Sequence, residues 1–233
     1  MIFAIPLYDD NPTVRTPVVT YFLIGLCTGS FFWQLGHNER EILYTYGMIP
    51  AELFGYWHPP RLYQVLPPWA KILTSMFLHG GWFHLIGNML YLWIFGNNVE
   101  DVLGRGRYFF LYLSCGIAAA LAQAFSNPAS HIPMVGASGA IAGVTGAYFL
   151  FFPRARIVTL VPIFIFLQII ELPAVFFLLF WFAFQLLLGI GSLGMDTATG
   201  GVAFWAHIGG FLAGMVLGPM LALSRPRTVR PAW

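Results

Sequence analysis

Long stretches without a charged side chain constrain the fold of this chain more than any other feature. The longest covers residues 108–153, which contain no Asp, Glu, Lys or Arg. A helix needs about 20 apolar residues to cross the hydrocarbon core of a bilayer, so this stretch can cross twice. Only 9% of the chain is charged, against about 25% in an ordinary soluble domain, and 58% is apolar. The sequence therefore indicates a polytopic membrane protein.

Six apolar segments have the length and composition of membrane-spanning helices. We predict an all-α membrane protein with one membrane domain at residues 1–233, whose helices cover approximately residues 17–35, 78–99, 108–125, 138–153, 172–193 and 202–223. Residues 36–71 form an outer loop rich in aromatic residues and proline. A seventh apolar segment, residues 157–170, has only 14 residues. As a helix it rises about 21 Å, less than a core of roughly 30 Å, so we expect it to lie at the interface or to extend the next helix.

Basic residues are divided unequally between the two sides that six crossings define. With the N-terminus in the cytoplasm, the cytoplasmic side holds eight of the eleven, namely Arg15, Arg105, Arg107, Arg154, Arg156, Arg225, Arg227 and Arg230. The outer side holds Arg40, Arg61 and Lys71. Because Arg and Lys gather on the cytoplasmic side of membrane proteins, this distribution favours six crossings with both termini in the cytoplasm.

The first residues do not have the pattern of a cleaved signal peptide. Residues 1–15 contain Asp9, Asp10 and two prolines, whereas a signal peptide has a basic segment followed by an apolar one. The short termini also lack an organelle-targeting segment. We therefore expect a multi-pass protein of the cell (cytoplasmic) membrane of a prokaryote.

Three polar side chains lie at one expected depth in the membrane, those of Ser138, His84 and His207. Each is 16 to 18 residues from the nearest charged residue expected on the cytoplasmic side. At about 1.5 Å per residue, this places them roughly 24 to 27 Å from that side, a few ångströms below the outer edge of the core. Water can be admitted to that depth from outside, so we expect one polar site there.

The spacing of small and polar residues indicates how the helices meet. His84 and Asn88 are four residues apart, and so project from one face of a helix. His207 is followed by glycines at 210, 214 and 218, and Ser138 by glycines at 139, 143 and 146. Ridges of small residues let two helices approach closely. We therefore expect Ser138 to lie within hydrogen-bond reach of His207.

These residue types predict a nucleophilic site. A serine hydroxyl attacks a carbonyl only when a base removes its proton, and neutral imidazole is the usual base near neutral pH. Ser138 is the candidate nucleophile and His207 the candidate base. Backbone N–H groups of a helix starting at Ser138, together with His84 and Asn88, are candidate donors to an oxyanion. No Asp or Glu is expected at this depth, so we predict a dyad.

Other readings of the same residues remain open. The string Gly136-Ala137-Ser138-Gly139 also fits simple helix packing, and it does not match the Gly-x-Ser-x-Gly elbow of soluble hydrolases, because residue 140 is alanine. Zinc bound by His79, His84 and His207 is disfavoured, since the spacing lacks the glutamate of a metalloprotease signature. We expect no metal and no other cofactor. His79 fits a packing role, and Glu100 fits either a structural contact or a solvated helix end.

The chain closely resembles the rhomboid family of intramembrane serine proteases, from Pro17 to Gly218. The motifs that carry the resemblance are HGGWFHLIGN at residues 79–88, GASG at residues 136–139 and AHIGG at residues 206–210. The resemblance implies that Ser138 is the nucleophile, that His207 is the general base, and that His84 and Asn88 line the oxyanion hole. It also implies a close helix contact at Gly210 and Gly214, and a gate for substrates that consists of the fifth helix and the loop after it.

Two positions depart from the family pattern. The Trp-Arg pair that many members carry in the outer loop is absent, and the nearest sequence is Trp69-Ala70-Lys71. Some members place a tyrosine one turn after the serine to stack on the histidine, whereas this chain has Ala142. The orientation of the imidazole therefore depends on other contacts.

The favoured function is a serine endopeptidase that hydrolyses peptide bonds in or near transmembrane segments of membrane-anchored proteins. Its expected partners are single-pass transmembrane substrates and the lipid bilayer, with no nucleic acid. One alternative is a catalytically inactive rhomboid-like protein that binds such clients. The other is a small-solute transporter, which six helices and buried polar groups favour, but which the scarcity of ionisable residues at mid-depth disfavours.

Overall fold

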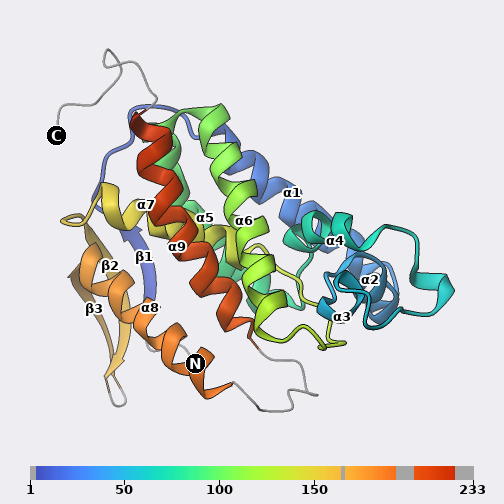
Figure 1. Ribbon diagram of the computed structural model, residues 1–233. Coiled ribbons are helices and arrows are strands. Elements are labelled where there is room, and N and C mark those ends of the chain that lie inside the picture. The colour runs from blue at the N-terminus through green and yellow to red at the C-terminus, as the bar shows by residue number, and fades with distance from the viewer. Residues whose placement is uncertain (1–3, 164–165, 193–201, 224–233) are drawn as a thin grey trace.

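The computed structural model describes residues 4–163, 166–192 and 202–223, and there the chain is predominantly helical (Figure 1). The long helices are α1 (Val18–Leu35), α5 (Trp82–Leu103), α6 (Arg105–Ser126), α7 (Ser138–Phe151), α8 (Ala174–Gly191) and α9 (Phe204–Leu223). Between α1 and α5 lie α2 (Glu39–Tyr46), α3 (Pro50–Leu53) and α4 (Pro68–Thr74), with 3-10 turns at Arg61–Tyr63 and Ser75–Phe77. The strands are β1 (Ile5–Asp9), β2 (Arg156–Ile163) and β3 (Phe166–Pro173).

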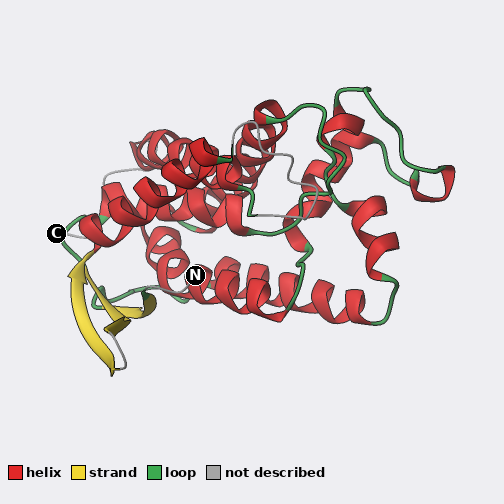
Figure 2. Cartoon of the chain, turned by 90° about the horizontal axis from the view of Figure 1, so that it is seen from below, coloured by secondary structure: helices red, strands yellow, loops and turns green. Residues whose placement is uncertain are grey.

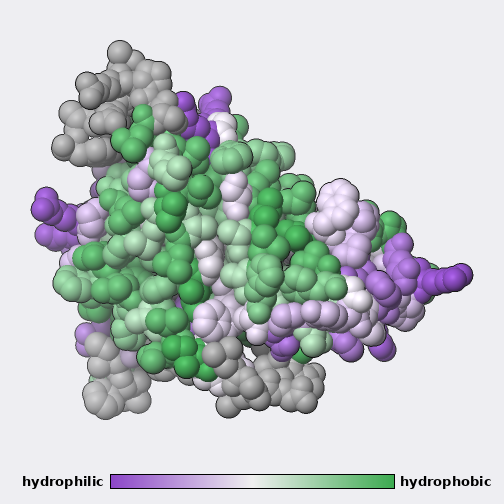
Figure 3. Space-filling model, viewed as in Figure 1, coloured by the Kyte–Doolittle hydropathy of each residue, from purple (hydrophilic) through white to green (hydrophobic). Residues whose placement is uncertain are grey.

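Long helices occupy the six apolar segments of the sequence. Among the described residues, α1, α6, α8 and α9 are long and apolar enough to cross a membrane. The apolar α7 has only 14 residues, and α5 has 22 residues but carries Glu100 and Asp101 in its last turn. Apolar residues cover the helices in Figure 3, whereas hydrophilic residues gather at the end that holds α2 and α3. An outer surface of this kind is that of a multi-pass membrane protein.

The shortest long helix, α7, lies inside the bundle and contacts α5, α6, α8 and α9. Every residue from Gly139 to Tyr148 is buried. A helix that is apolar on all sides and shielded on all sides is a core helix. The first residue of α7, Ser138, is therefore held by the packing of four neighbouring helices.

A three-stranded antiparallel sheet departs from the all-α prediction. Its strand order is β1-β2-β3, with Asp9 opposite Ile157 and Ile157 opposite Leu172. The expectation that residues 157–170 extend the next helix is wrong, because this segment forms β2 and β3. Two prolines explain the difference: Pro162 lies within the segment and Pro173 immediately precedes α8, and neither can continue a helix from the residues before it. The segment is also rich in β-branched residues, which favour strands.

The hairpin of β2 and β3 stands to one side of the helices (Figure 2). At its base, Arg156 pairs with Glu171 at 2.9 Å, and both side chains are more than half exposed. Toward its tip, Phe166, Leu167 and Ile169 expose about two thirds of their surface, 65%, 70% and 66%. The hairpin therefore carries a charged base and an exposed apolar arm.

Strand β1 ties the sheet to the core helices. The Asp9 carboxylate accepts hydrogen bonds from the Tyr148 hydroxyl of α7 at 2.6 Å and from the Asn98 amide of α5 at 2.7 Å. Burial raises the pKa of Asp9 from its ordinary value of 3.8 to about 6, although the hydrogen bond from Tyr148 opposes this shift. The end of α7 opposite Ser138 is thus fixed to the sheet by a partly buried acid.

Glu100 makes a structural contact, which decides between the two alternatives that the sequence left open. Its carboxylate accepts hydrogen bonds from the backbone N–H groups of Val19 and Thr20, at 2.9 and 2.8 Å, and from the Thr20 hydroxyl at 2.8 Å. These N–H groups lie in the first turn of α1, where the helix itself supplies no acceptors. Glu100 therefore joins the last turn of α5 to the start of α1.

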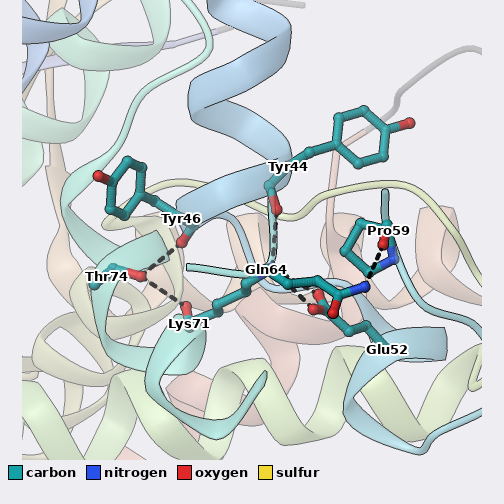
Figure 4. A network of polar contacts seen from close by, with 7 residues as sticks. All are labelled: Tyr44, Tyr46, Glu52, Pro59, Gln64, Lys71 and Thr74. Carbon is teal, nitrogen blue, oxygen red and sulfur yellow. Dashed lines mark hydrogen bonds and ion pairs between the residues drawn. The ribbon is translucent and has the colours of Figure 1, made fainter. Parts of the chain in front are cut away.

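Residues 36–71 form a folded unit around a buried ion pair (Figure 4). The Lys71 ammonium donates to the Glu52 carboxylate at 2.8 Å and to the Tyr44 carbonyl at 2.9 Å. Lys71 is fully buried and Glu52 is 4% exposed. A buried charge is tolerated when it is paired and hydrogen-bonded, as here. Lys71 thus anchors this loop in a chain that lacks the Trp-Arg pair.

Candidate active site

Ser138 and His207 are in direct contact. Ser138 is the first residue of α7, and His207 lies in the first turn of α9. The Ser138 hydroxyl oxygen is 2.9 Å from Nε2 of His207. Both residues are half-buried, so neither is sealed inside the bundle. A hydroxyl in this position can pass its proton to the imidazole when its oxygen attacks a carbonyl carbon.

Glycines set the distance between the two helices that carry this pair. A Cβ atom on Gly210 would collide with the carbonyl oxygen of Gly139, and one on Gly214 would collide with that of Gly143. The backbones of α7 and α9 therefore touch directly, as small residues at matched spacing permit. Because Ser138 and His207 lie at the same end of this contact, main-chain packing determines their separation.

Backbone hydrogen bonds hold the segment that precedes Ser138 against the 36–71 unit and against the 3-10 turn that follows α4. Met48 and Met134 exchange two hydrogen bonds, at 3.1 and 2.7 Å. The N–H of Gly136 donates to the carbonyl of Ser75 at 2.9 Å. The folded loop anchored by Lys71 thus fixes the approach of the chain to α7.

His84 faces the same small space as Ser138. At Gly136, where φ is +128°, a Cβ atom would lie 2.7 Å from Nε2 of His84 and 3.7 Å from the Ser138 hydroxyl oxygen. The backbone conformation and the nearby imidazole both favour glycine at this position. Absence of a side chain at Gly136 therefore leaves room between His84 and Ser138.

Further hydrogen-bond donors without partners lie one turn after His84 and at the start of α7. Asn88, one turn after His84 on α5, is 7% exposed, and its side-chain N–H₂ group has no partner in the described ranges. Ala137, the residue that precedes α7, has no side chain that could cap the helix. The first N–H groups of a helix lack acceptors within the helix. They and the positive end of the helix dipole are available to an anionic oxygen.

Gln185 of α8 completes the surroundings of His207, and sequence reasoning missed it. Its side-chain oxygen is 2.8 Å from Nδ1 of His207, and the Trp181 ring centroid is 5.8 Å from the imidazole centroid. Gln185 carries the one amide in a helix that otherwise has no hydroxyl, amide or charged side chain. A single amide in an apolar helix was the available signal, but the sequence alone does not show that this amide faces His207.

His79 lies behind His84 and is 2% exposed. Its ring centroid is 5.3 Å from that of His84, with the two planes at 68°. The backbone of His79 exchanges hydrogen bonds of 3.0 and 3.2 Å with the Gln34 side chain of α1. These contacts give His79 a packing role beneath His84.

Known proteins share much of this sequence. Residues 67–224, more than half of the chain, match the model of the Rhomboid domain family. Rhomboid protein 1, mitochondrial, of Saccharomyces cerevisiae is 28% identical over 196 residues, which cover 78% of this chain and 53% of that protein. Rhomboid protease GluP of Bacillus subtilis is 34% identical over 134 residues, 56% of this chain and 24% of that protein. The presenilin-associated rhomboid-like protein, mitochondrial, of Bos taurus is 29% identical over 207 residues, 79% of this chain and 49% of that protein. The matched region thus spans about half of these relatives or less.

Proposed function

The chain belongs to the rhomboid family, and on that premise we propose that it is an intramembrane serine endopeptidase. It hydrolyses peptide bonds in or near transmembrane segments of membrane-anchored proteins. The observation that carries this proposal is the 2.9 Å contact between the Ser138 hydroxyl and Nε2 of His207. The likeness to a Bacillus subtilis protein whose name describes a protease supports it.

The proposed reaction uses the two residues in turn. As the Ser138 oxygen bonds to the substrate carbonyl carbon, its proton moves to Nε2 of His207. When the tetrahedral intermediate collapses, the C–N bond breaks and the imidazolium returns the proton to the departing amine nitrogen. Water then loses a proton to His207 as it attacks the acyl-enzyme. Release of the new carboxyl group returns the proton to Ser138.

His84, Asn88 and the first N–H groups of α7 serve as the oxyanion hole. This role is assigned because the His84 imidazole and the Ser138 hydroxyl flank Gly136, and because Asn88 lies one turn after His84 on α5. The unpaired amide of Asn88 is the group that this role explains best. Removing one oxyanion donor typically costs about 3 kcal/mol of transition-state stabilisation.

The proposed orientation has six crossings with both termini in the cytoplasm of a cell membrane. The helices α5, α7 and α9 would then begin on the outer side, with His84, Ser138 and His207 in their first turns and Asn88 one turn further along α5. Because α7 has 14 residues and rises about 21 Å, Ser138 lies below the surface of a roughly 30 Å core. A helical substrate has its carbonyls satisfied within the helix, so the cleaved segment must unwind first.

The test is cleavage of a model transmembrane substrate by the purified protein in bilayers. Ser138→Ala and His207→Ala should each abolish cleavage while circular dichroism shows unchanged helical content. A fluorophosphonate probe should label the native chain and not Ser138→Ala. Cleavage that persists in Ser138→Ala would refute the nucleophile assignment. A native chain that binds such segments but cleaves none would point to a client-binding relative.

A further inference from the structure

We propose that Gln185 is the positioning residue for His207, fixing the tautomer in which Nε2 can accept the proton of Ser138. This inference rests on the proposed function, in which His207 acts as the base. Gln185 takes the position that an orienting carboxylate holds in a Ser-His-Asp triad.

The contacts form a continuous line of hydrogen bonds through the imidazole. On one side the Gln185 side-chain oxygen is 2.8 Å from Nδ1. On the other side the Ser138 hydroxyl oxygen is 2.9 Å from Nε2. Gln185 is only 8% exposed, so bulk water has little access to compete for this contact. Both ring nitrogens are therefore engaged by side chains from two different helices.

The chemistry of the amide oxygen decides which nitrogen carries the proton. A carbonyl oxygen can only accept, so Nδ1 must donate and must carry the hydrogen. Neutral imidazole has one N–H, which leaves a lone pair on Nε2 facing the Ser138 hydroxyl. In the other tautomer Nε2 carries the hydrogen and donates it to the Ser138 oxygen. This nitrogen then has no lone pair with which to accept the proton of Ser138. One hydrogen bond from Gln185 therefore selects the form of His207 that the reaction needs.

An amide suits this position better than a carboxylate would. An ionised group on an apolar helix within a membrane is costly, whereas the amide provides an acceptor with no net charge. When His207 takes the proton, its Nδ1–H remains bonded to the Gln185 oxygen, and the bond becomes charge-assisted. The same contact thus orients the neutral base and stabilises its protonated form.

The position of α8 controls this hydrogen bond. Trp181, Gln185 and Gly189 follow one another at four-residue spacing and so share the face of α8 that meets α9. Trp181 lies against the imidazole, and a Cβ atom on Gly189 would come within 3.2 Å of the Ile208 side chain. The other side of α8 is exposed at Phe180 and Leu187. His207 has its acceptor only while α8 is seated on α9.

The decisive measurement is the tautomer of His207, read by ¹⁵N NMR of histidine-labelled protein in lipid bilayers. Comparison with a His207→Gln sample assigns the signals. The native protein should show the hydrogen on Nδ1, and Gln185→Leu should show both tautomers. Gln123→Leu is the matched control, because the hydrogen bond of Gln123 on α6 is to the backbone N–H of Ala206, at 3.3 Å, and the imidazole nitrogens of His207 bond to Gln185 and Ser138. It should leave the tautomer unchanged.

Kinetics supply an independent readout. In Gln185→Leu, kcat should fall about tenfold with KM unchanged, as loss of one hydrogen bond of about 1.4 kcal/mol predicts. Gln185→Glu, which keeps an acceptor, should retain kcat within about threefold. Native His207 with its hydrogen on Nε2, or Gln185→Leu with native kcat and native fold, would overturn the inference. Activity in Ser138→Ala would instead overturn the proposed function, and the tautomer measurement does not depend on activity.

Discussion

The α7–α9 pair and the β2–β3 hairpin are both strongly apolar, yet their apolar residues serve opposite purposes. In the helix pair, glycines remove side chains so that two backbones touch, and every residue of α7 from Gly139 to Tyr148 is buried. In the hairpin, large side chains at Phe166, Leu167 and Ile169 point outward. Apolar sequence alone therefore does not determine whether a segment packs inward or remains displayed. The spacing of small residues and the placing of prolines make that distinction.

The largest effect is expected where the helix pair is tightest. Gly214→Val would place side-chain atoms against the Gly143 carbonyl, which is backbone and cannot rotate away. Overpacking of this kind costs about 3 kcal/mol of unfolding free energy, and separation of α7 from α9 should abolish cleavage. Gly25→Ala is the control, because a Cβ there meets nothing within 4 Å. The free energy of unfolding in bilayers and the rate of substrate cleavage should be measured for both variants. A fully active Gly214→Val would show that the backbone contact does not set the site.

The buried ion pair on the site side of the molecule comes next, because its loss should lower stability at least as much as Gly214→Val does but leaves the contact between Ser138 and His207 in place. Lys71→Met leaves the Glu52 carboxylate buried without its partner, which typically costs about 3 to 5 kcal/mol. The double variant Lys71→Met with Glu52→Met removes both charges and should recover most of this loss. Denaturant unfolding of the three proteins tests the coupling. Equal losses in the single and double variants would contradict a buried pair.

Asp9 of β1 links the α7–α9 pair to the sheet that contains the β2–β3 hairpin. Its titration should be visible in the stability of β1. Because burial raises the folded-state pKa to about 6, above the ordinary 3.8, the fold favours the protonated acid. This contribution is complete below about pH 4 and is lost as the pH rises through about 6. Hydrogen exchange of β1 amides should therefore be slower at pH 4.5 than at pH 7.5, after correction for intrinsic rates. Asp9→Asn should remove the difference, and parallel pH profiles for the two proteins would disprove the linkage.

The exposed pair at the hairpin base should matter least. Arg156 and Glu171 are 2.9 Å apart, but both side chains are more than half exposed. Such pairs contribute about 0 to 1 kcal/mol, so Arg156→Gln should change the free energy of unfolding by less than that. Raising the salt concentration should reduce even this difference. A loss as large as that of Lys71→Met would show that the hairpin is structurally coupled to the bundle core.

The sequence predicted the helical segments because uncharged apolar runs have few alternatives in a bilayer. It also predicted the contact between Ser138 and His207, since glycines repeat at helical spacing on both helices. The pairing of β1 with β2 was missed because the two strands lie about 150 residues apart along the chain, and strand pairing at that separation has no local signature. The β2–β3 hairpin is local, and its prolines and β-branched residues were visible in the sequence, but its length and apolar character were interpreted as helical. Gln185 was missed for a different reason: one amide among apolar residues gives no direction until α8 is placed beside α9.

The main-chain contact between α7 and α9 has a consequence for how the protein responds to different lipids. Helices adapt to thicker or thinner membranes by tilting, at a cost of fractions of a kcal/mol per ångström of mismatch. Since these two helices have no side-chain layer between them that could compress or slide, they must tilt as one rigid unit. The spacing of Ser138 and His207 should then be the same in short-chain and long-chain phospholipids. Any dependence of turnover on acyl-chain length would arise in the entry of the peptide.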